Sequence, residues 1–475
     1  MFSLFHETSC GSGRTLSRRE WMRIGGLSWL GLSALDLSRL RAEAASQSPA
    51  ARHRPNSCVF IFLFGGPSHI DLWDMKPDAP VEIRGEFRPA RTNVPGIQLC
   101  EHLPLLAQQM DKLCLLRSMA HRDPVHGTAC SQMITGRPHP RPGTTDTFAP
   151  DDWPSISSLV MRYGRAQGGL PPSIVLPWYL MFPSQGRRIA GQTGGLMGEQ
   201  HNAFLVEGDP SRPGFEVPGI KLANDVPLER LLDRGTLLRQ LEALERGLTL
   251  LPSTAMRDTN YREAFSMLAG RQASEAFDLH REPQTVRDRY GKEKFSQSLL
   301  LARRLVEAGA SLVTVNWDDD TRDEKQSPFW DTHHNNFARL RDRLVPVFDR
   351  SFSAFLQDLH DRGLLETTLV AVMGEFGRTP KIGKVVQNGA TEKTGRDHWP
   401  YAFTVLLAGG GVRGGQVYGA TDPIGAYVKD SPVSPPDLAA TIFYHLGIDR
   451  STHYLSPLLG VGYEVSEGRP IPNLG

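Results

Sequence analysis

The chain has 475 residues, of which 40% are hydrophobic and 22% are charged, a composition typical of a soluble globular protein with a sizeable core. Its 53 basic and 52 acidic residues give a formal net charge of +1, so no overall field attracts nucleic acid or anionic lipid. We therefore expect no nucleic-acid partner.

The first 44 residues have the pattern of a twin-arginine signal peptide. Arg18 and Arg19 precede a short, glycine-rich and moderately apolar run, and small residues at 42–44 suit a cleavage site. An amphipathic helix with a chance arginine pair is the alternative. The run is well under the roughly 20 residues that cross a bilayer, so we expect no transmembrane helix in the mature chain. We predict export to the periplasm or cell envelope, a linker at 45–56 and a folded domain at 57–475.

The first half of this domain opens with two apolar runs that predict buried strands. "CVFIFLF" ends at Gly65 and Gly66, and "DKLCLLRSMAH" at 111–121 leads into a predicted helix over 126–135. Residues 139–290 are rich in glycine and proline, and we expect them to form a large insertion.

Regular alternation returns near residue 294. An amphipathic helix, the strand "SLVTVNW", a long helix from 336 to 362 and the strands within "TTLVAVMG" and "YAFTVLLAG" follow one another. Pro346 should kink the long helix. This order predicts an α/β fold, in which a central, mostly parallel sheet is sandwiched by helices.

Polar side chains beside three of these strands are candidate metal ligands. They are Asp331, His333 and His334 after one strand, Glu375 after the next, and Asp397 and His398 before a third. Because strand ends in a parallel sheet share one edge, we expect these groups to converge. Imidazole and carboxylate groups predict a divalent metal ion, first zinc and then iron, manganese or calcium. The simpler alternative is that Asp331 caps the following helix while the histidines are solvated.

"GEFGRTP" allows two interpretations. Glu375 and Arg378 form an ion pair in a turn, or Glu375 binds the metal while the planar guanidinium of Arg378 clamps phosphate, sulfate or carboxylate.

Four residues of the first half are further candidates. Asp71 and Asp74 could complete a metal site, although Asp71 also suits a helix cap. His126 and Thr128 stand at a predicted helix N-terminus, which favours anions and activates nucleophiles.

Several longer segments together resemble one exported protein family. They are "FGGPSHIDLWDMKP", "RSMAHRDPVHGTACSQMITG", "GGLMGEQHNAFLVEGDP", "WDTHHNNF", "GEFGRTP" and "GRDHWP". These segments look like the family with domain of unknown function number fifteen hundred and one, within the alkaline phosphatase and sulfatase superfamily. The resemblance runs from about residue 15 to the C-terminus, and it implies an alkaline phosphatase-like sheet between helices.

Superfamily roles carry over to some positions. The resemblance places Asp331, one of His333 and His334, and His398 in one metal site, and His126 near the nucleophile position. Glu375 and Phe376 replace the usual Asp-His pair. Gly65 or Gly66 stands where the first strand normally ends in a metal-binding Asp, and the sulfatase nucleophile motif is absent. These departures imply a one-metal or altered site.

We therefore expect an exported metal-dependent hydrolase that acts on a phosphate or sulfate ester of a small molecule or polysaccharide. The ion would polarise the ester or activate water, Arg378 would stabilise negative charge, and His126 or Thr128 would act as base or nucleophile. The alternatives are a catalytically silent cell-envelope protein that binds a metal or an anion, and a structural protein without a metal.

Overall fold

The computed structural model describes residues 56–144, 147–218, 220, 230, 233, 271–383 and 394–475. The predicted signal peptide and nearly all of the predicted linker lie outside these ranges, so export stays a prediction. Within them, no helix is both long and apolar enough to cross a membrane.

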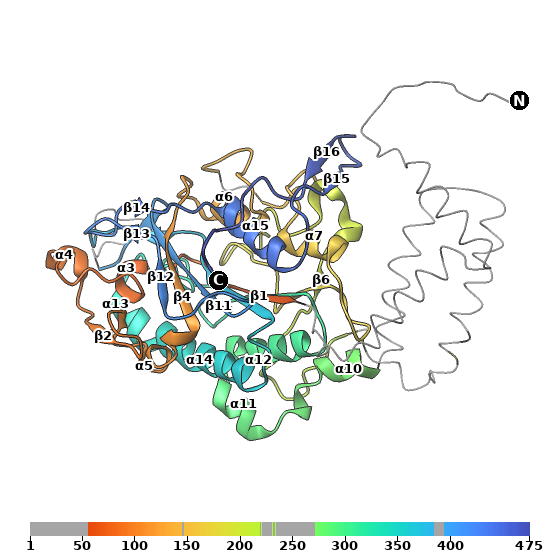
Figure 1. The fold of residues 1–475 in the computed structure, drawn as a ribbon, viewed down its shortest axis with the longest axis horizontal. Coiled ribbons are helices and arrows are strands. Elements are labelled where there is room, and N and C mark those ends of the chain that lie inside the picture. Colours follow the sequence, from red (N-terminus) through yellow and green to blue (C-terminus); the bar gives the residue numbers. More distant parts are fainter. Residues whose placement is uncertain are drawn as a thin grey trace, which may run out of the picture. The chain divides into compact units, whose positions relative to one another are not determined.

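An eight-stranded sheet forms the centre of the fold (Figure 1). Its order is β12 (Gln416–Tyr418), β4 (Leu113–Met119), β11 (Phe403–Ala408), β8 (Thr368–Met373), β1 (Ser57–Phe62), β7 (Leu312–Asn316), β5 (Ser173–Leu176) and β6 (Phe204–Leu205). Among these strands only β11 is reversed, because it runs antiparallel to both β4 and β8 while every other pair is parallel. The predicted mostly parallel sheet is confirmed.

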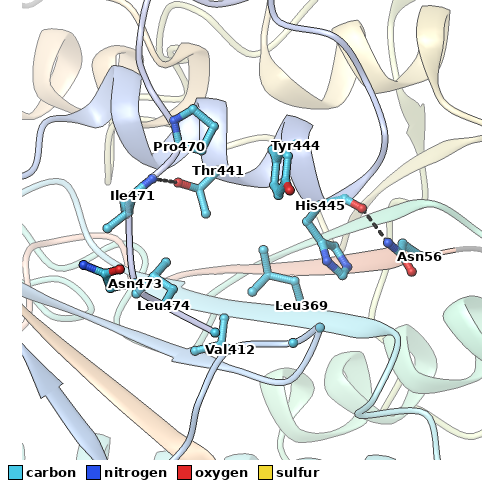
Figure 2. Close-up of a pocket in the computed structure, with 13 residues that line it drawn as sticks. Asn56, Leu369, Val412, Thr441, Tyr444, His445, Pro470, Ile471, Asn473 and Leu474 are labelled. Atoms are coloured by element: carbon cyan, nitrogen blue, oxygen red, sulfur yellow. Dashed lines mark hydrogen bonds between the residues drawn. The ribbon is translucent and has the colours of Figure 1, made fainter.

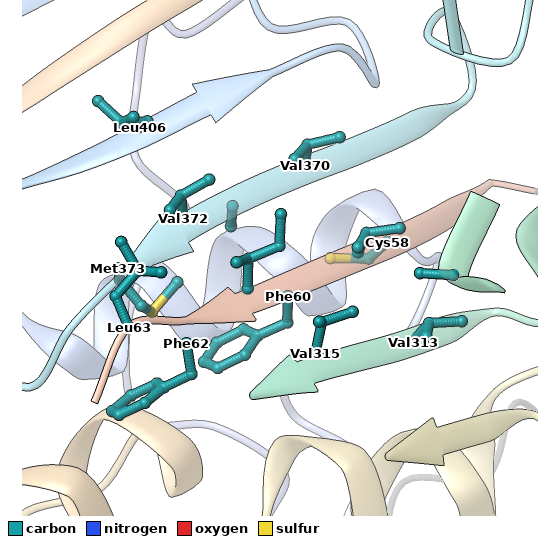
Figure 3. Packing of buried hydrophobic residues seen from close by; sticks show 14 of the residues in the cluster. Cys58, Phe60, Phe62, Leu63, Val313, Val315, Val370, Val372, Met373 and Leu406 are labelled. Atoms are coloured by element: carbon teal, nitrogen blue, oxygen red, sulfur yellow. The ribbon is translucent and has the colours of Figure 1, made fainter. Parts of the chain in front are cut away.

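The centre of the core is β1, which lies between β8 and β7 (Figure 3). All six of its residues are buried, as the unbroken apolar run predicted. Phe60 and Phe62 alternate onto the same face and stack with ring centroids 6.2 Å apart. Burial of one such side chain contributes about 1.5–3 kcal/mol, so this strand anchors the sheet.

Helices cover both faces of the sheet (Figure 1). One face carries α12 (Lys294–Glu307) and α14 (Val345–Asp361), and the other carries α6 (His126–Thr135), α7 (Ile156–Tyr163) and α15 (Pro435–His445). The long helix expected over 336–362 is divided into α13 (Asn336–Arg339), a π-helical turn at Leu340–Leu344 and α14. The turn lies just before Pro346, whose ring excludes a regular preceding turn.

The structure differs from the expected insertion at 139–290. β5 and β6 lie in that range, and β5 pairs with β7 at one side of the central sheet. Only four residues form β5, a serine and three apolar residues between prolines, and β6 has two residues, so neither gave a strong strand pattern. Most of 219–270 lies outside the described residues.

Short elements connect these layers. They are α3 (His69–Leu72), α4 (Val81–Arg84), β2 (Pro89–Arg91), β3 (Gln98–Cys100), α5 (Pro104–Ala107), α10 (Arg271–Phe277), α11 (Gln284–Tyr290), β9 (Gly377–Arg378), β10 (His398–Trp399), β13 (Ala420–Thr421), β14 (Val428–Asp430), β15 (His453–Leu455) and β16 (Gly462–Glu464).

Candidate metal centre

Four side chains converge at the carboxyl edge of the parallel strands. His126, Asp331, His333 and His398 each place one potential ligand atom within 4.8 Å of the others. His126 begins α6 after β4, the next two follow β7, and His398 lies on β10 just before β11. A residue that precedes a parallel strand would lie at the opposite edge. The reversal of β11 is therefore what brings His398 to this cluster.

The Asp331 carboxylate is at the centre of the cluster. Its Oδ1 lies 3.0 Å from Nε2 of His333 and 3.2 Å from Nε2 of His398, and its Oδ2 lies 3.1 Å from Nε2 of His126. The Nε2 atoms of His333 and His398 are 3.0 Å apart. At His126 the close approach has no hydrogen-bonding orientation, so its Nε2 is buried without a hydrogen-bond partner among the described residues.

Each of the three histidines fixes its other ring nitrogen on an oxygen acceptor. Nδ1 contacts Glu375 Oε1 at 2.5 Å in His126, Asp397 Oδ1 at 2.8 Å in His333 and the Pro124 carbonyl at 2.6 Å in His398. An acceptor at Nδ1 holds a ring proton there, so each imidazole offers Nε2 as its metal-binding atom once the ring is neutral. Three nitrogen lone pairs and one carboxylate are a donor set that fits a divalent transition metal.

The charges within the cluster also fit a cation. Burial lowers the pKa of His126, but the Asp331 and Glu375 carboxylates outweigh it and raise that pKa to about 9. Burial raises the pKa of Asp331, yet His333, His126 and Arg378 hold it well below its usual range. Burial and the neighbouring charge of His126 lower the pKa of His398 to about 3. Without a metal, protons on imidazoles balance these carboxylates, and a divalent ion can replace them.

Glu375 lies beside the cluster and not within it. Besides His126, its carboxylate accepts the backbone N–H of Gly65 at 2.9 and 3.1 Å. Gly65 has a φ of +113°, and a Cβ there would lie 2.2 Å from the backbone nitrogen of Asp331. Only glycine allows the chain after β1 to pass this close. In the structure Glu375 thus contacts His126 from outside the group of four potential ligands.

Arg378 differs from the expected anion clamp, because its side chain is fully buried. Its guanidinium donates to the carbonyl groups of Gly66 at 2.9 Å, Arg396 at 3.0 Å and Trp330 at 3.2 Å, and to Asp331 Oδ1 at 2.5 Å. These contacts use the N–H groups of the guanidinium inside the protein. Arg378 thus neutralises and orients Asp331 instead of facing a substrate.

Two predicted carboxylate ligands lie in other ion pairs. Asp71 accepts from Arg396 at 2.7 and 2.8 Å, and both side chains are fully buried. Asp74 pairs with Lys76 at 2.9 Å and with Arg117 at 3.4 Å. Each acid is satisfied by a cation in its own surroundings, and neither belongs to the cluster.

Three further candidates also lie outside the ligand set. His334 follows His333 but is not in the cluster, and its backbone N–H donates to Ser327 Oγ at 3.1 Å. Asp397 accepts from Nδ1 of His333, and none of its atoms belongs to the group of four potential ligand atoms. Thr128 lies in α6 with its side chain fully buried. His126, expected as a nucleophile or base, is a member of the cluster.

Solvent reaches the cluster from the side of two imidazoles. The side chains of His126 and His398 are 16% and 11% exposed, whereas those of Asp331 and His333 are nearly fully buried. The Phe376 ring packs against both exposed imidazoles, with ring centroids 5.1 and 4.4 Å apart. Phe376 is itself 1% exposed, so this ring shields the two imidazoles from solvent.

A hollow of about 650 Å³ lies at the other end of the strands (Figure 2). It is lined by Leu369, near the start of β8, and by His445 at the end of α15. The cluster instead lies beyond the end of β8, where Glu375 is found. The hollow is therefore separate from the candidate metal centre.

Comparisons with known proteins give one family and several structures of similar fold. The family model "Protein of unknown function (DUF1501)" matches residues 55–474, and no curated protein matches the chain. One similar structure is Ps i-CgsB in complex with k-i-k-neocarrahexaose, with 13% identity, 84% of this chain and 73% of that chain covered, and a TM-score of 0.40. The PsFucS1 sulfatase from Pseudoalteromonas sp. has 11% identity, with 91% of this chain and 76% of that chain covered and a TM-score of 0.36. A protein in the alkaline phosphatase superfamily from Vibrio parahaemolyticus has 11% identity, with 88% of this chain and 70% of that chain covered and a TM-score of 0.35.

Proposed function

The chain belongs to the DUF1501 family of proteins of unknown function, and we propose that it is an exported metal-dependent hydrolase of anionic phosphate or sulfate esters. The observation that carries this proposal is the convergence of three Nε2 atoms on Asp331, with every Nδ1 held by an acceptor. The twin-arginine pattern at Arg18 and Arg19 supports export to the periplasm or cell envelope.

In this proposal, His126, Asp331, His333 and His398 hold one divalent ion. The three-nitrogen, one-oxygen set suits zinc, with iron and manganese as alternatives, whereas calcium prefers oxygen ligands. When bound, such an ion polarises an ester oxygen or lowers the pKa of a water molecule. The neutral imidazoles and the single carboxylate leave a positive charge on the bound ion, which attracts an anionic ester.

The surrounding residues orient these ligands. Glu375 and Asp397 fix the rings of His126 and His333, as carboxylates behind metal-bound histidines generally do. Arg378 holds Asp331 and compensates part of the buried negative charge. Phe376 excludes water from one side of His398 and so strengthens electrostatic interactions at the centre.

A second candidate function is a catalytically silent cell-envelope protein that binds a metal or an anion. Four protein groups offer one ligand atom each, which is the number found in structural zinc sites, whereas catalytic sites keep one position open. The burial of Arg378 also removes the expected anion clamp.

Metal analysis combined with turnover separates these functions. We would measure metal by mass spectrometry on protein folded in vivo, for the wild type, Asp331→Ala, His398→Ala and the control His334→Ala. We expect about one ion per chain, lost in the first two variants and kept in the control. Hydrolysis of 4-nitrophenyl phosphate or sulfate that disappears with the metal supports the hydrolase. A bound ion without turnover on either ester supports the silent protein, and a metal-free wild type contradicts the hydrolase and leaves only an anion-binding or structural protein.

A further inference from the structure

Three aromatic side chains form a continuous patch next to the metal centre. The ring centroid of Trp399 lies 5.0 Å from that of Tyr401 and 5.7 Å from that of Tyr427, and the two tyrosines are 5.7 Å apart. Tyr401 is 39% exposed and Tyr427 is 53% exposed. Partly exposed tyrosine and tryptophan rings present an apolar face together with a polar group, which suits a ligand that has both kinds of surface.

The patch is joined to the centre through one short strand. Trp399 follows His398 on β10, and it pairs with Gly377, the neighbour of Arg378 on β9. Successive side chains of a strand point to opposite sides, while their Cα atoms are only about 3.8 Å apart. The patch and the metal cluster therefore lie on the two sides of β10, next to each other along the strand.

The loop that carries Tyr427 is already ordered. The Asp422 carboxylate accepts the backbone N–H groups of Ile424 at 3.1 Å, Ala426 at 2.8 Å and Tyr427 at 3.2 Å. The indole N–H of Trp399 donates to the Ala426 carbonyl, which ties this loop to β10. Rings held in this way lose little conformational entropy when a ligand binds.

The arrangement of the rings limits what can bind. A quaternary ammonium group needs space between rings, but these rings contact one another and leave none. Two half-exposed tyrosines offer on the order of 200 Å² from their side chains. This is far below the roughly 1,200 Å² of a stable protein interface, so these rings alone would not hold a second copy of the chain.

A sugar ring has the matching chemistry. It combines an apolar C–H face, which packs on aromatic faces, with a rim of hydroxyl groups that the phenol groups of Tyr401 and Tyr427 can hydrogen-bond. We propose that Trp399, Tyr401 and Tyr427 form a subsite that binds a sugar ring of the substrate beside the metal centre. This inference rests on the proposed function and narrows its substrate class to esters on carbohydrates.

Affinity electrophoresis tests the subsite directly. Native gels would contain dextran, dextran sulfate, carrageenan or heparin, and the metal-loaded wild type would be compared with Tyr401→Ala/Tyr427→Ala and with Tyr444→Ala. Tyr444 is 75% exposed and lines the separate hollow, so it is a matched control. We expect retardation in at least one gel for the wild type and the control, and affinity at least about tenfold weaker in the double variant. No retardation in any gel, or equal retardation of the double variant, overturns the subsite.

Two further measurements separate this inference from the proposed function. The double variant should keep its metal and its turnover of 4-nitrophenyl esters, which are too small to need the patch. Retained sugar binding without any turnover would reject the hydrolase while keeping the subsite. A wild-type dimer that becomes a monomer in the double variant, measured by light scattering, would show that the patch is a protein interface and overturn the inference.

Discussion

Glu375 lies 2.5 Å from Nδ1 of His126, and this contact joins the end of β8 to the start of α6. The same carboxylate accepts the N–H of Gly65, which follows β1. One buried acid thus connects three segments behind the candidate metal centre. It determines which nitrogen of His126 faces Asp331.

The first prediction concerns this acid. Glu375→Gln keeps an oxygen acceptor but removes the charge that makes the His126 ring a stronger ligand. We expect metal affinity to fall by about 10–100-fold, measured by competition with a chromophoric chelator. Asp397→Asn should behave similarly through His333. Unchanged affinity in both variants would contradict the assigned positioning roles.

The second prediction concerns protons released by metal binding. Burial lowers the pKa values of His126 and His333, but their carboxylate partners outweigh this and raise both, for His126 to about 9. A metal must displace these protons, so affinity should fall as pH decreases below about 9. Calorimetry at pH 7 in buffers of different ionisation enthalpy should show release of between about one and two protons per ion. No release would mean that the metal binds elsewhere.

The third prediction concerns stability. Asp71 and Arg396 form a bidentate ion pair with both side chains fully buried. Asp71→Ala leaves the guanidinium without its carboxylate, and we expect a loss of about 3–5 kcal/mol in the free energy of unfolding, measured in urea. Arg396→Ala should cost a similar amount. Because the residues are in contact, the double variant should lose less than the sum of the single losses, and simple additivity would contradict the pairing.

The fourth prediction concerns acid stability. Burial lowers the pKa of His445, whose Nε2 donates to the Ser57 carbonyl at 2.9 Å. The unfolded chain therefore binds a proton near pH 6.5 that the folded chain does not. The stability that neutral His445 contributes to the folded state is present above pH 6.5, and it is lost as the pH falls from there toward the pKa of His445 in the folded chain. His445→Gln should lose less stability than the wild type between pH 7.5 and pH 5.5 in urea unfolding. An equal or larger loss would contradict the assignment.

The sequence predicts the strands β1, β4, β7 and β8 well, because each is an apolar run that ends in a polar or glycine-rich loop. The bounds of α6 are also confirmed, at His126–Thr135. The short β5 and β6 leave too few residues for a pattern. The direction of β11 depends on long-range pairing, so local periodicity cannot reveal it.

For the candidate site, too, local patterns were predictable and long-range contacts were not. Residue type and strand order predicted that Asp331 and His333 lie at this edge, and the structure brings them together with His398. His398 precedes its strand, so it joins them only because β11 is reversed. The distinction between a ligand and its hydrogen-bonding partner depends on side-chain direction, which composition does not contain. Glu375 and Asp397 were therefore grouped with the ligands. A buried ion pair and an anion-binding site contain the same residue types. The sequence therefore could not show that Arg378 is buried against Asp331 and not exposed to a substrate.

The reversed strand β11 also determines when the centre can exist during synthesis. The four clustered residues extend from His126 to His398 along a chain of 475 residues. A nascent chain has the first histidine long before the last, and β11 must insert between β4 and β8 before His398 reaches its partners. Closure over such a distance occurs late because the entropy of a long loop must first be overcome. The four clustered side chains therefore come together only in the nearly completed chain, and partly synthesised chains lack the cluster.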